Sequence, residues 1–420
     1  MLASASKSGP VPAVPAEKTS RHLGYLDALR GLAILGVLLI HATLAVLDGP
    51  NGVPAQIAFI GQRGVQLFYM VSAFTLFYTL DAQRQEWHPT RNFYLRRFFR
   101  IAPLFYVDLL VRLAIFHLGD LRLILYLSAF LFLNGFSHSA INTAVPAGWS
   151  IAVETSFYVF VPLLFSRLRT LGRAISVSLV LTIAVEVISY TLGAGTAKEY
   201  YTFLWFPVEL PVFLLGIITY LLWKGSLPLI ESLPTRSTAS HPALVTRRSL
   251  AALLLLFTVA LIWGTLNLHP FEGSTFSWQV THLLPVSLAF MPLILAVAIY
   301  PLPLLVNRLT RWLGRVSYSA YLAHPFLLIA LLWMHDRYFH GIFHGHLHGT
   351  LTGVLLMFLL LTLVAAPVSL FLWRFIEQPG IRLGRRVIAA LENRAAIRAS
   401  TLVPPAKEFI ETGSTSDEQF

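Results

Sequence analysis

The chain of 420 residues is 56% hydrophobic, and charged residues make up only 12% of it, against about 25% in an ordinary soluble domain. This composition excludes a water-soluble protein, and the absence of cysteine excludes disulfides, thiolate metal sites and cysteine nucleophiles. The net charge of +11 does not require a nucleic-acid partner, because membrane proteins concentrate Lys and Arg in their cytoplasmic loops.

Residues 1–22 are rich in Pro, Ala and Ser and contain no apolar stretch near their start. They predict a disordered cytoplasmic leader and not a cleaved signal peptide. Apolar segments long enough to cross a bilayer follow. With the amino terminus inside, Lys and Arg gather in the inner loops, which sets the orientation in the inner membrane with both termini cytoplasmic. The ten predicted spans are approximately 24–44, 57–80, 101–118, 149–166, 174–193, 203–223, 249–267, 280–300, 317–335 and 350–373.

An eleventh apolar segment, near residues 121–137, is too short for a full crossing. Counting it as a span would also place the basic cluster at 167–173 outside, so we predict a re-entrant or interfacial helix. The predicted fold class is therefore all-α integral membrane, with about ten transmembrane helices and this additional helix. The predicted organisation is the leader, a membrane domain over 23–380, and a cytoplasmic tail over 381–420 that is largely disordered from about residue 395.

Two ionisable residues, Arg30 and His41, lie within the apolar run of the first span. Eleven residues at 100° each return to within about 20° of the starting direction, so both share one helix face about 16 Å apart along the axis. Ionisable residues at such positions are costly and usually functional. The simpler alternatives are an interfacial ion pair of Arg30 with Asp27 and a helix-packing hydrogen bond from His41.

An arginine cluster precedes the third span and consists of Arg96, Arg97 and Arg100. Guanidinium groups suit bidentate contact with phosphate. The positive-inside rule alone explains the charge equally well. The presence of Arg30 at the same predicted depth favours a binding site for a phosphorylated ligand.

The fourth span carries a carboxylate, Glu154, about one and a half turns from its outer end. This is the depth predicted for His41, and a carboxylate there should be paired. We therefore expect Glu154 to orient the imidazole of His41 as part of a general-base pair. Trp149, at the start of the same span, is a typical interfacial anchor.

The ninth span contains Tyr321 and His324, followed by Pro325, which should kink the helix. A kink frees backbone carbonyls, and these are tolerated where protein or a water-filled cavity satisfies them. His324, Tyr321 and Trp149 are therefore candidates for a substrate pathway.

Other polar residues of the spans carry weaker predictions. Asp108 and Arg112, at i and i+4, should form a self-neutralising structural pair, whereas Glu186 and Glu209 have no evident partner. Histidines in a predicted outer loop could collect a divalent metal, but only Asp336 could complete the site, so a solvated loop is favoured and no metal site is predicted. These histidines are His335, His340, His344, His346 and His348.

Six motifs occur in order between Tyr25 and Pro379. They are Leu26–Gly31 continued to His41, Gly64–Phe74, Phe93–Pro103, Trp149–Tyr158, Ser317–His324 and Glu377–Pro379. Together they resemble the acyltransferase 3 family of membrane O-acyltransferases. Some members of that family carry an appended hydrolase-like domain, which we do not expect within these 420 residues.

The resemblance implies ten core spans and a cytoplasmic acyl-CoA donor, usually acetyl-CoA, with no permanently bound cofactor. It also implies transfer to a sugar hydroxyl of a surface glycan or lipid-linked precursor on the outer side. Arg30 and His41 would be essential, with Glu154 and the arginine cluster contributing.

The expected mechanism joins two depths of the membrane. Arg30 and the arginine cluster would hold the phosphates of CoA, while His41 acts as general base on the acceptor hydroxyl. A transient acyl-histidine is an alternative. A transporter or flippase for a glycan or lipid is the alternative function, since it too would place Arg, His and Glu in a membrane cavity.

Overall fold

The computed structural model describes residues 23–47, 61–115, 122–136, 147–191, 205–235, 245–267, 283–338 and 347–402. Every regular element within these ranges is helical, which confirms the predicted all-α class. The predicted leader and residues 403–420 of the predicted tail lie outside the described residues.

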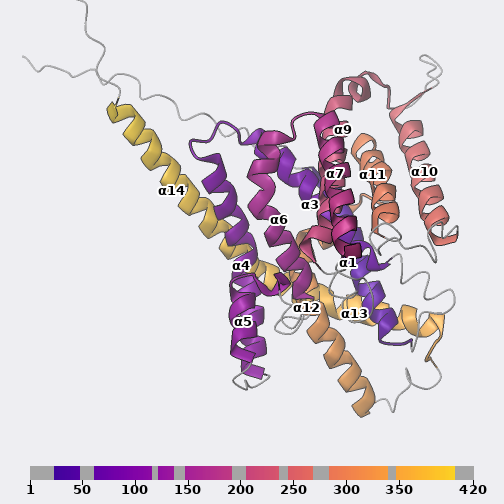
Figure 1. The fold of residues 1–420 in the computed structure, drawn as a ribbon. Coiled ribbons are helices and arrows are strands. Elements are labelled where there is room, and N and C mark those ends of the chain that lie inside the picture. The colour runs from indigo at the N-terminus through magenta and orange to yellow at the C-terminus, as the bar shows by residue number, and fades with distance from the viewer. Residues whose placement is uncertain are drawn as a thin grey trace, which may run out of the picture.

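The α-helices lie side by side, and most of them run up and down in the view of Figure 1. In chain order they are α1 (Gly24–Leu44), α3 (Gly64–Ala82), α4 (Pro89–Ile115), α5 (Arg122–Phe130), α6 (Gly148–Arg167), α7 (Leu171–Thr191), α9 (Phe206–Ser232), α10 (Arg247–Asn267), α11 (Leu284–Ile299), α12 (Arg308–Tyr338), α13 (Leu351–Leu372) and α14 (Gln378–Leu402), with a π-helical turn at Trp373–Glu377 between the last two.

Each of the ten predicted spans overlaps one of these helices, but eight helices meet both the length and the hydropathy needed to cross a membrane. The two others are α11, which has only 16 residues, and α4, whose first half carries the arginine cluster. The structure thus supports a multi-pass membrane protein, and the count of ten stays a prediction. Helix α5 has nine residues, about 13 Å, and is too short to cross.

Helices α1 and α12 approach each other unusually closely. A Cβ atom added at Gly314 would lie 1.7 Å from the carbonyl oxygen of Asp27, and one added at Gly31 would lie 2.1 Å from that of Thr310. Small residues permit such close backbone contact between helices in membranes. The residues next to these glycines, including Arg30, are thereby held at a defined distance from α12.

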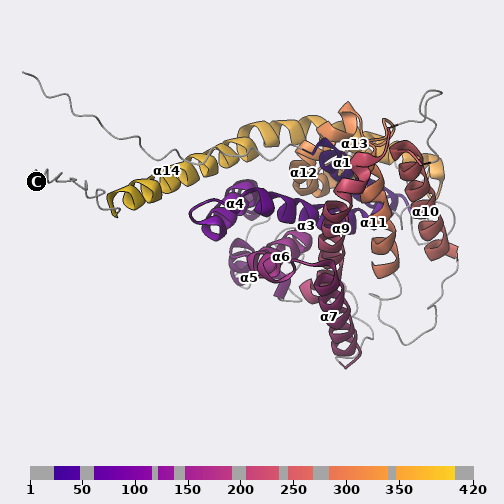
Figure 2. The same cartoon turned by 90° about the horizontal axis from the view of Figure 1, so that it is seen from above.

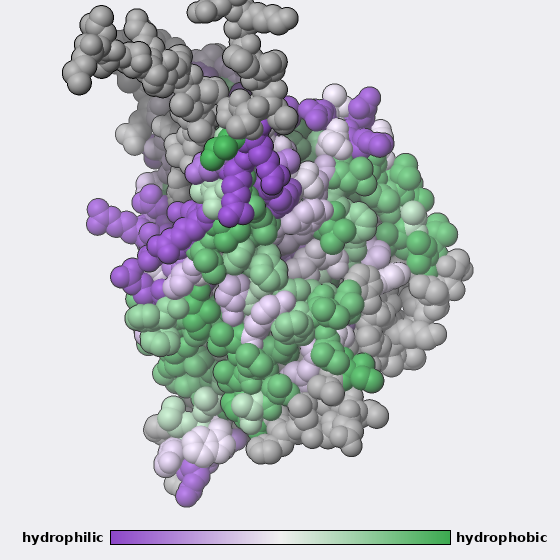
Figure 3. Space-filling view, turned by 90° about the vertical axis from the view of Figure 1, so that its left-hand side faces the viewer, coloured by the Kyte–Doolittle hydropathy of each residue, from purple (hydrophilic) through white to green (hydrophobic). Residues whose placement is uncertain are grey.

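The outer helices present apolar side chains outwards. Among the residues of the candidate spans, only 11% are buried in α10 and 17% in α7, compared with 72% in α9. Large exposed apolar side chains include Leu253, Leu256, Val180 and Ile183. Figure 3 shows an apolar band across the middle of one face, with hydrophilic residues gathered above it and at its lower tip. This pattern is that of a protein whose exposed surface meets lipid.

Helix α14 lies in the predicted tail and continues to Leu402, past residue 395. It runs away from the bundle in both views (Figures 1 and 2). Its first turns pack on α4, where a Cβ added at Gly384 would lie 2.7 Å from the Cβ of Phe99. Further along, Glu392 accepts hydrogen bonds from Arg91 (3.1 Å) and Asn92 (2.9 Å). Tertiary contacts with α4 thus hold α14 in place as far as Glu392.

Candidate active site

A polar cavity lies among α1, α3, α4, α6 and α12 and has an empty volume of about 690 Å³. Three arginines and one carboxylate line it, each from the buried part of a helix: Arg30, Arg97, Arg100 and Glu154. We call this the arginine pocket. Its remaining polar lining consists of Ser72, Tyr69, Ser150, Tyr158, Ser317, Tyr318 and Tyr321.

Glu154 is held by two hydroxyl groups within the arginine pocket. Ser72 donates a hydrogen bond to its Oε1 at 2.6 Å, and Tyr158 donates to the same oxygen at 2.7 Å. The carboxylate is also close enough to interact electrostatically with all three arginines. It therefore balances part of their positive charge.

The predicted pairing of Glu154 with His41 is not found, since the two side chains share no hydrogen bond in the part of the chain that the structure describes. The reason is the level at which α6 begins. Tyr321, in the middle of α12, donates to the carbonyl of Ala147, the residue before α6 (3.0 Å). Because α6 starts beside the middle of α12, Glu154 lies deeper in the bundle than we predicted by counting residues from the outer end of its span.

Arg30 has partners from two helices. Its Nη2 donates to Thr75 of α3 at 2.8 Å, and its Nη1 lies 3.5 Å from the Asp27 carboxylate on its own helix. The ion pair with Asp27 that was the simpler alternative therefore exists, but at a long distance. It does not remove Arg30 from the arginine pocket, whose lining includes this side chain.

The arginine cluster divides between two places. Arg97 and Arg100 line the arginine pocket, where the Arg97 guanidinium lies 5.9 Å from the centre of the Tyr158 ring. Arg96 instead hydrogen-bonds Gln83 (2.9 Å) and forms an ion pair with Glu86. Neighbouring residues of a helix point 100° apart, whereas residues three apart share a face. Helix geometry thus separates Arg96 from the other two.

His41 and His324 form a buried pair, with ring centres 4.6 Å apart. The Nδ1–H of His41 donates to the carbonyl of Val37 at 2.8 Å, and the Nδ1–H of His324 donates to that of Tyr321 at 2.6 Å. These bonds fix both rings with Nδ1 protonated, so Nε2 is the basic nitrogen of each neutral ring. The Nε2 of His324 is buried and has no hydrogen-bond partner among the described residues.

Tyr321 joins the histidine pair to the arginine pocket. Its ring lines the pocket and lies 5.5 Å from the ring centre of His324. Its hydroxyl also accepts a hydrogen bond from Ser150 at 2.6 Å. The third residue of the predicted pathway, Trp149, packs partly buried against the core next to Ser150 and does not line the pocket.

The other polar predictions have clear outcomes where the chain is described. Asp108 and Arg112 form the expected pair at 2.8 Å. Glu209, predicted to lack an evident partner, accepts a hydrogen bond from Gln66 of α3 at 3.0 Å. No group of three potential metal ligands occurs among the residues that can be described; His340, His344 and His346 lie outside them.

Several pocket residues were not predicted as site residues. Tyr158 lies at i+4 from Glu154, a spacing that could have indicated its hydrogen bond. Ser72 and Tyr318 lie within the motifs, but nothing in their spacing indicated the pocket. Glu377 is buried in the π-helical turn, accepts from Ser319 at 3.0 Å and interacts electrostatically with Arg100.

Comparison with known proteins agrees with the motifs. The acyltransferase domain of the acyltransferase 3 family matches residues 23–374. The chain belongs to this family. The match covers all the pocket residues and both histidines of the pair, and it leaves out only the terminal segments and α14.

Curated relatives at low identity are named as O-acetyltransferases. The Staphylococcus aureus (strain COL) protein named "Putative O-acetyltransferase SACOL0978" is 24% identical over 361 residues, covering 77% of this chain and 53% of its own length. O-acetyltransferase OatA of S. aureus (strain MRSA252) is 21% identical over 407 residues, covering 91% of this chain and 61% of its own length. The chain thus spans little more than half the length of these relatives. No solved structure matches it.

Proposed function

We propose that this protein is a membrane O-acyltransferase that moves an acyl group, acetyl in the first instance, from cytoplasmic acyl-CoA to a hydroxyl of a surface carbohydrate or lipid-linked glycan. The proposal rests on the position of Tyr321, whose side chain contacts two sites of different chemistry. The arginine pocket suits an anionic donor, the histidine pair suits a hydroxyl acceptor, and Tyr321 touches both.

The donor would bind with its phosphates near the end at which α1 begins, which we propose as the cytoplasmic end on the basis of the loop charges. Arg97 and Arg100 of α4 offer forked donors to these phosphates, and Arg30 of α1 lines the same pocket. Three arginines and one carboxylate line the pocket, while Asp27 and Glu377 interact with Arg30 and Arg100 from outside its lining. These carboxylates offset the cost of placing three cations in the membrane, and the guanidinium groups remain able to contact the anionic phosphates of CoA.

The histidine pair would perform the proton transfers. His41 Nε2 takes the proton of the acceptor hydroxyl while the hydroxyl oxygen attacks the thioester carbonyl. The tetrahedral intermediate then expels the CoA thiolate, which takes the proton back from His41. The products are the O-acyl ester and free CoA, and His41 returns to its neutral state. His324, whose ring packs against His41, would position the His41 ring during both steps.

The test uses purified protein in proteoliposomes with labelled acetyl-CoA and lipid-linked glycans extracted from a strain that lacks the gene. The wild type should release CoA and label the glycans. His41→Ala should lower the rate by about 100-fold or more, because general-base catalysis contributes about 100- to 10,000-fold. The matched control, His88→Ala, changes an exposed histidine outside the site and should retain full activity.

The result also decides between this proposal and transport. A transporter or flippase would leave acetyl-CoA intact while moving glycan or lipid across the vesicle membrane. Undiminished acyl transfer in His41→Ala would overturn the assigned role of the histidine. Label that remains attached to the denatured protein in the absence of acceptor would indicate the acyl-histidine route instead of direct transfer.

A further inference from the structure

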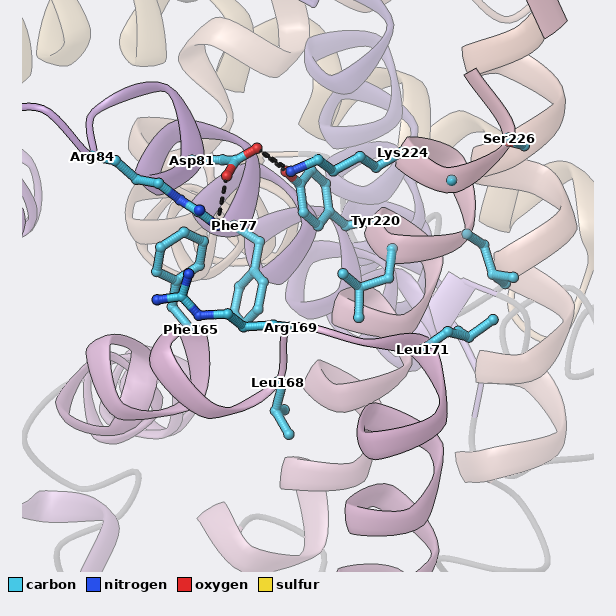
Figure 4. A pocket seen from close by; sticks show the side chains of 13 residues that line it. Phe77, Asp81, Arg84, Phe165, Leu168, Arg169, Leu171, Tyr220, Lys224 and Ser226 are labelled. Atoms are coloured by element: carbon cyan, nitrogen blue, oxygen red, sulfur yellow. Dashed lines mark hydrogen bonds and ion pairs between the residues drawn. The ribbon is translucent and has the colours of Figure 1, made fainter. Parts of the chain in front are cut away.

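A second cavity lies among α3, α6, α7 and α9 (Figure 4). It has an empty volume of about 1200 Å³ and is formed by the ends of α3 and α6, the start of α7 and the second half of α9. On α3, Ser72 lines the arginine pocket and Phe77 lines this cavity, and five residues turn the helix by about 140°. Phe77 is 1% exposed. The packed body of α3 therefore separates the two sites.

The lining of this cavity carries excess positive charge. It includes three cations, Arg84, Arg169 and Lys224, but one carboxylate, Asp81. Asp81 pairs with Arg84 at 2.8 Å and also with Lys224. No second carboxylate lines the cavity, so the described lining has two net positive charges.

Two of the guanidinium groups converge on one aromatic ring. Arg84 lies 5.0 Å and Arg169 lies 6.0 Å from the centre of the Phe165 ring, and Figure 4 shows both side chains reaching the ring from different helices and loops. The guanidinium of Arg169 uses its Nε for the carbonyl of Ser166 at 3.1 Å, which leaves the forked end available. Each of the two guanidinium groups presents a forked donor that suits a phosphate group.

The remaining wall is apolar and leads to the lipid-facing surface. Leu168 and Leu171 line the cavity beside the cations. Along α7, exposed apolar residues continue from this wall, with Ile175 at 41% and Leu179 at 59% exposure. A ligand with a phosphate head and hydrocarbon chains could place the head among the cations and the chains along α7.

We propose that this cavity is a binding site for the headgroup of an anionic phospholipid of the leaflet that surrounds this end of the protein. Basic pockets between membrane-spanning helices bind such headgroups. A soluble phosphorylated ligand would gain nothing from the apolar wall or from the exposed face of α7. The site is distinct from the arginine pocket and does not depend on the reaction performed there.

The proposal is tested by native mass spectrometry of the purified full chain, exchanged into detergent containing equal amounts of phosphatidylglycerol and phosphatidylcholine. The wild type should retain phosphatidylglycerol at least ten-fold over phosphatidylcholine, and high salt should reduce this preference. Equal retention of the two lipids by the wild type would overturn the proposal without any variant.

Two variants then locate the bound lipid. Arg84→Gln combined with Arg169→Gln should lower phosphatidylglycerol retention about ten-fold, with unchanged elution volume and melting temperature. The matched control is Arg173→Gln, an exposed arginine in the first turn of α7 that does not line the cavity, and it should bind like the wild type. An equal loss in both variants would show a diffuse charge effect. A loss of acetyl-CoA affinity in the double variant, with lipid retention unchanged, would assign the cavity to a soluble donor. Either result overturns the proposal.

Discussion

Helix α4 contains buried charge in both halves, but the two groups are neutralised in different ways. In the second half, Asp108 and Arg112 pair at 2.8 Å one turn apart, with side chains 7% and 2% exposed. In the first half, Arg97 and Arg100 find their carboxylates on other elements, namely Glu154 of α6 and Glu377 of the π-helical turn. Asp108 and Arg112 neutralise each other on one helix. The charged groups around Arg97 and Arg100 come from several helices, and they line a cavity that a ligand can enter.

The largest effect is expected from removing the two arginines of the first half. Arg97→Ala combined with Arg100→Ala should lower kcat/KM for acetyl-CoA by about 100- to 10,000-fold, because hydrogen bonds to charged groups contribute about 1.5–3 kcal/mol each. The measurement is acetyl-CoA turnover in proteoliposomes. If this variant binds acetyl-CoA with wild-type affinity, the two arginines only help to set the orientation of the protein in the membrane.

A substitution in the second half of α4 should lower the stability of the protein and leave donor binding unchanged. Asp108→Ala leaves the Arg112 guanidinium buried without its carboxylate, which typically costs about 3–5 kcal/mol. The melting temperature in detergent should therefore fall, while KM for acetyl-CoA in the surviving folded protein stays unchanged.

A double replacement serves as the control for this pair. Asp108→Leu with Arg112→Leu removes both charges together, and such replacements are often neutral or stabilising. It should recover most of the lost melting temperature. If the double variant is as unstable as Asp108→Ala, the stability depends on the shape of the pair and not on its charge balance.

A smaller and more specific effect is expected at Glu154. Glu154→Gln keeps an oxygen to accept from Ser72 and Tyr158 but removes the negative charge beside the arginines. The donor phosphates should then bind more tightly while the pocket is less well arranged for reaction, so KM for acetyl-CoA should fall together with a roughly ten-fold fall in kcat. Glu86→Gln, which breaks the ion pair with Arg96 on the other face of α4, is the control. A raised KM with unchanged kcat in Glu154→Gln would exclude this account.

The smallest effect is expected from a single hydroxyl group. Tyr158→Phe removes one donor to Glu154 and keeps the ring beside Arg97. A loss of about 1 kcal/mol, or roughly five-fold in kcat/KM, is expected from one such hydrogen bond. A loss above 100-fold would instead indicate that the Tyr158 hydroxyl contacts the substrate directly.

The sequence by itself determined the all-α membrane class, because that depends on composition and apolar length, and six motifs in order indicated the family. Arg30 and Glu154 stood out because a buried charge is costly, and Arg97 and Arg100 because a guanidinium cluster suits phosphate; these four residues do meet in one cavity. The Asp108–Arg112 pair was equally predictable, since both partners lie on one helix and the i, i+4 spacing alone brings them together.

Only the tertiary structure decided which buried groups from different helices share a depth. Glu154 was expected beside His41, but α6 begins next to Tyr321 in the middle of α12, and the carboxylate consequently joins the arginines. His41 meets His324 instead, on a helix that the close approach at Gly31 and Gly314 brings against its own. Residue counts along one helix give distances within that helix, whereas the relative height of two helices depends on packing between side chains that are far apart in the sequence.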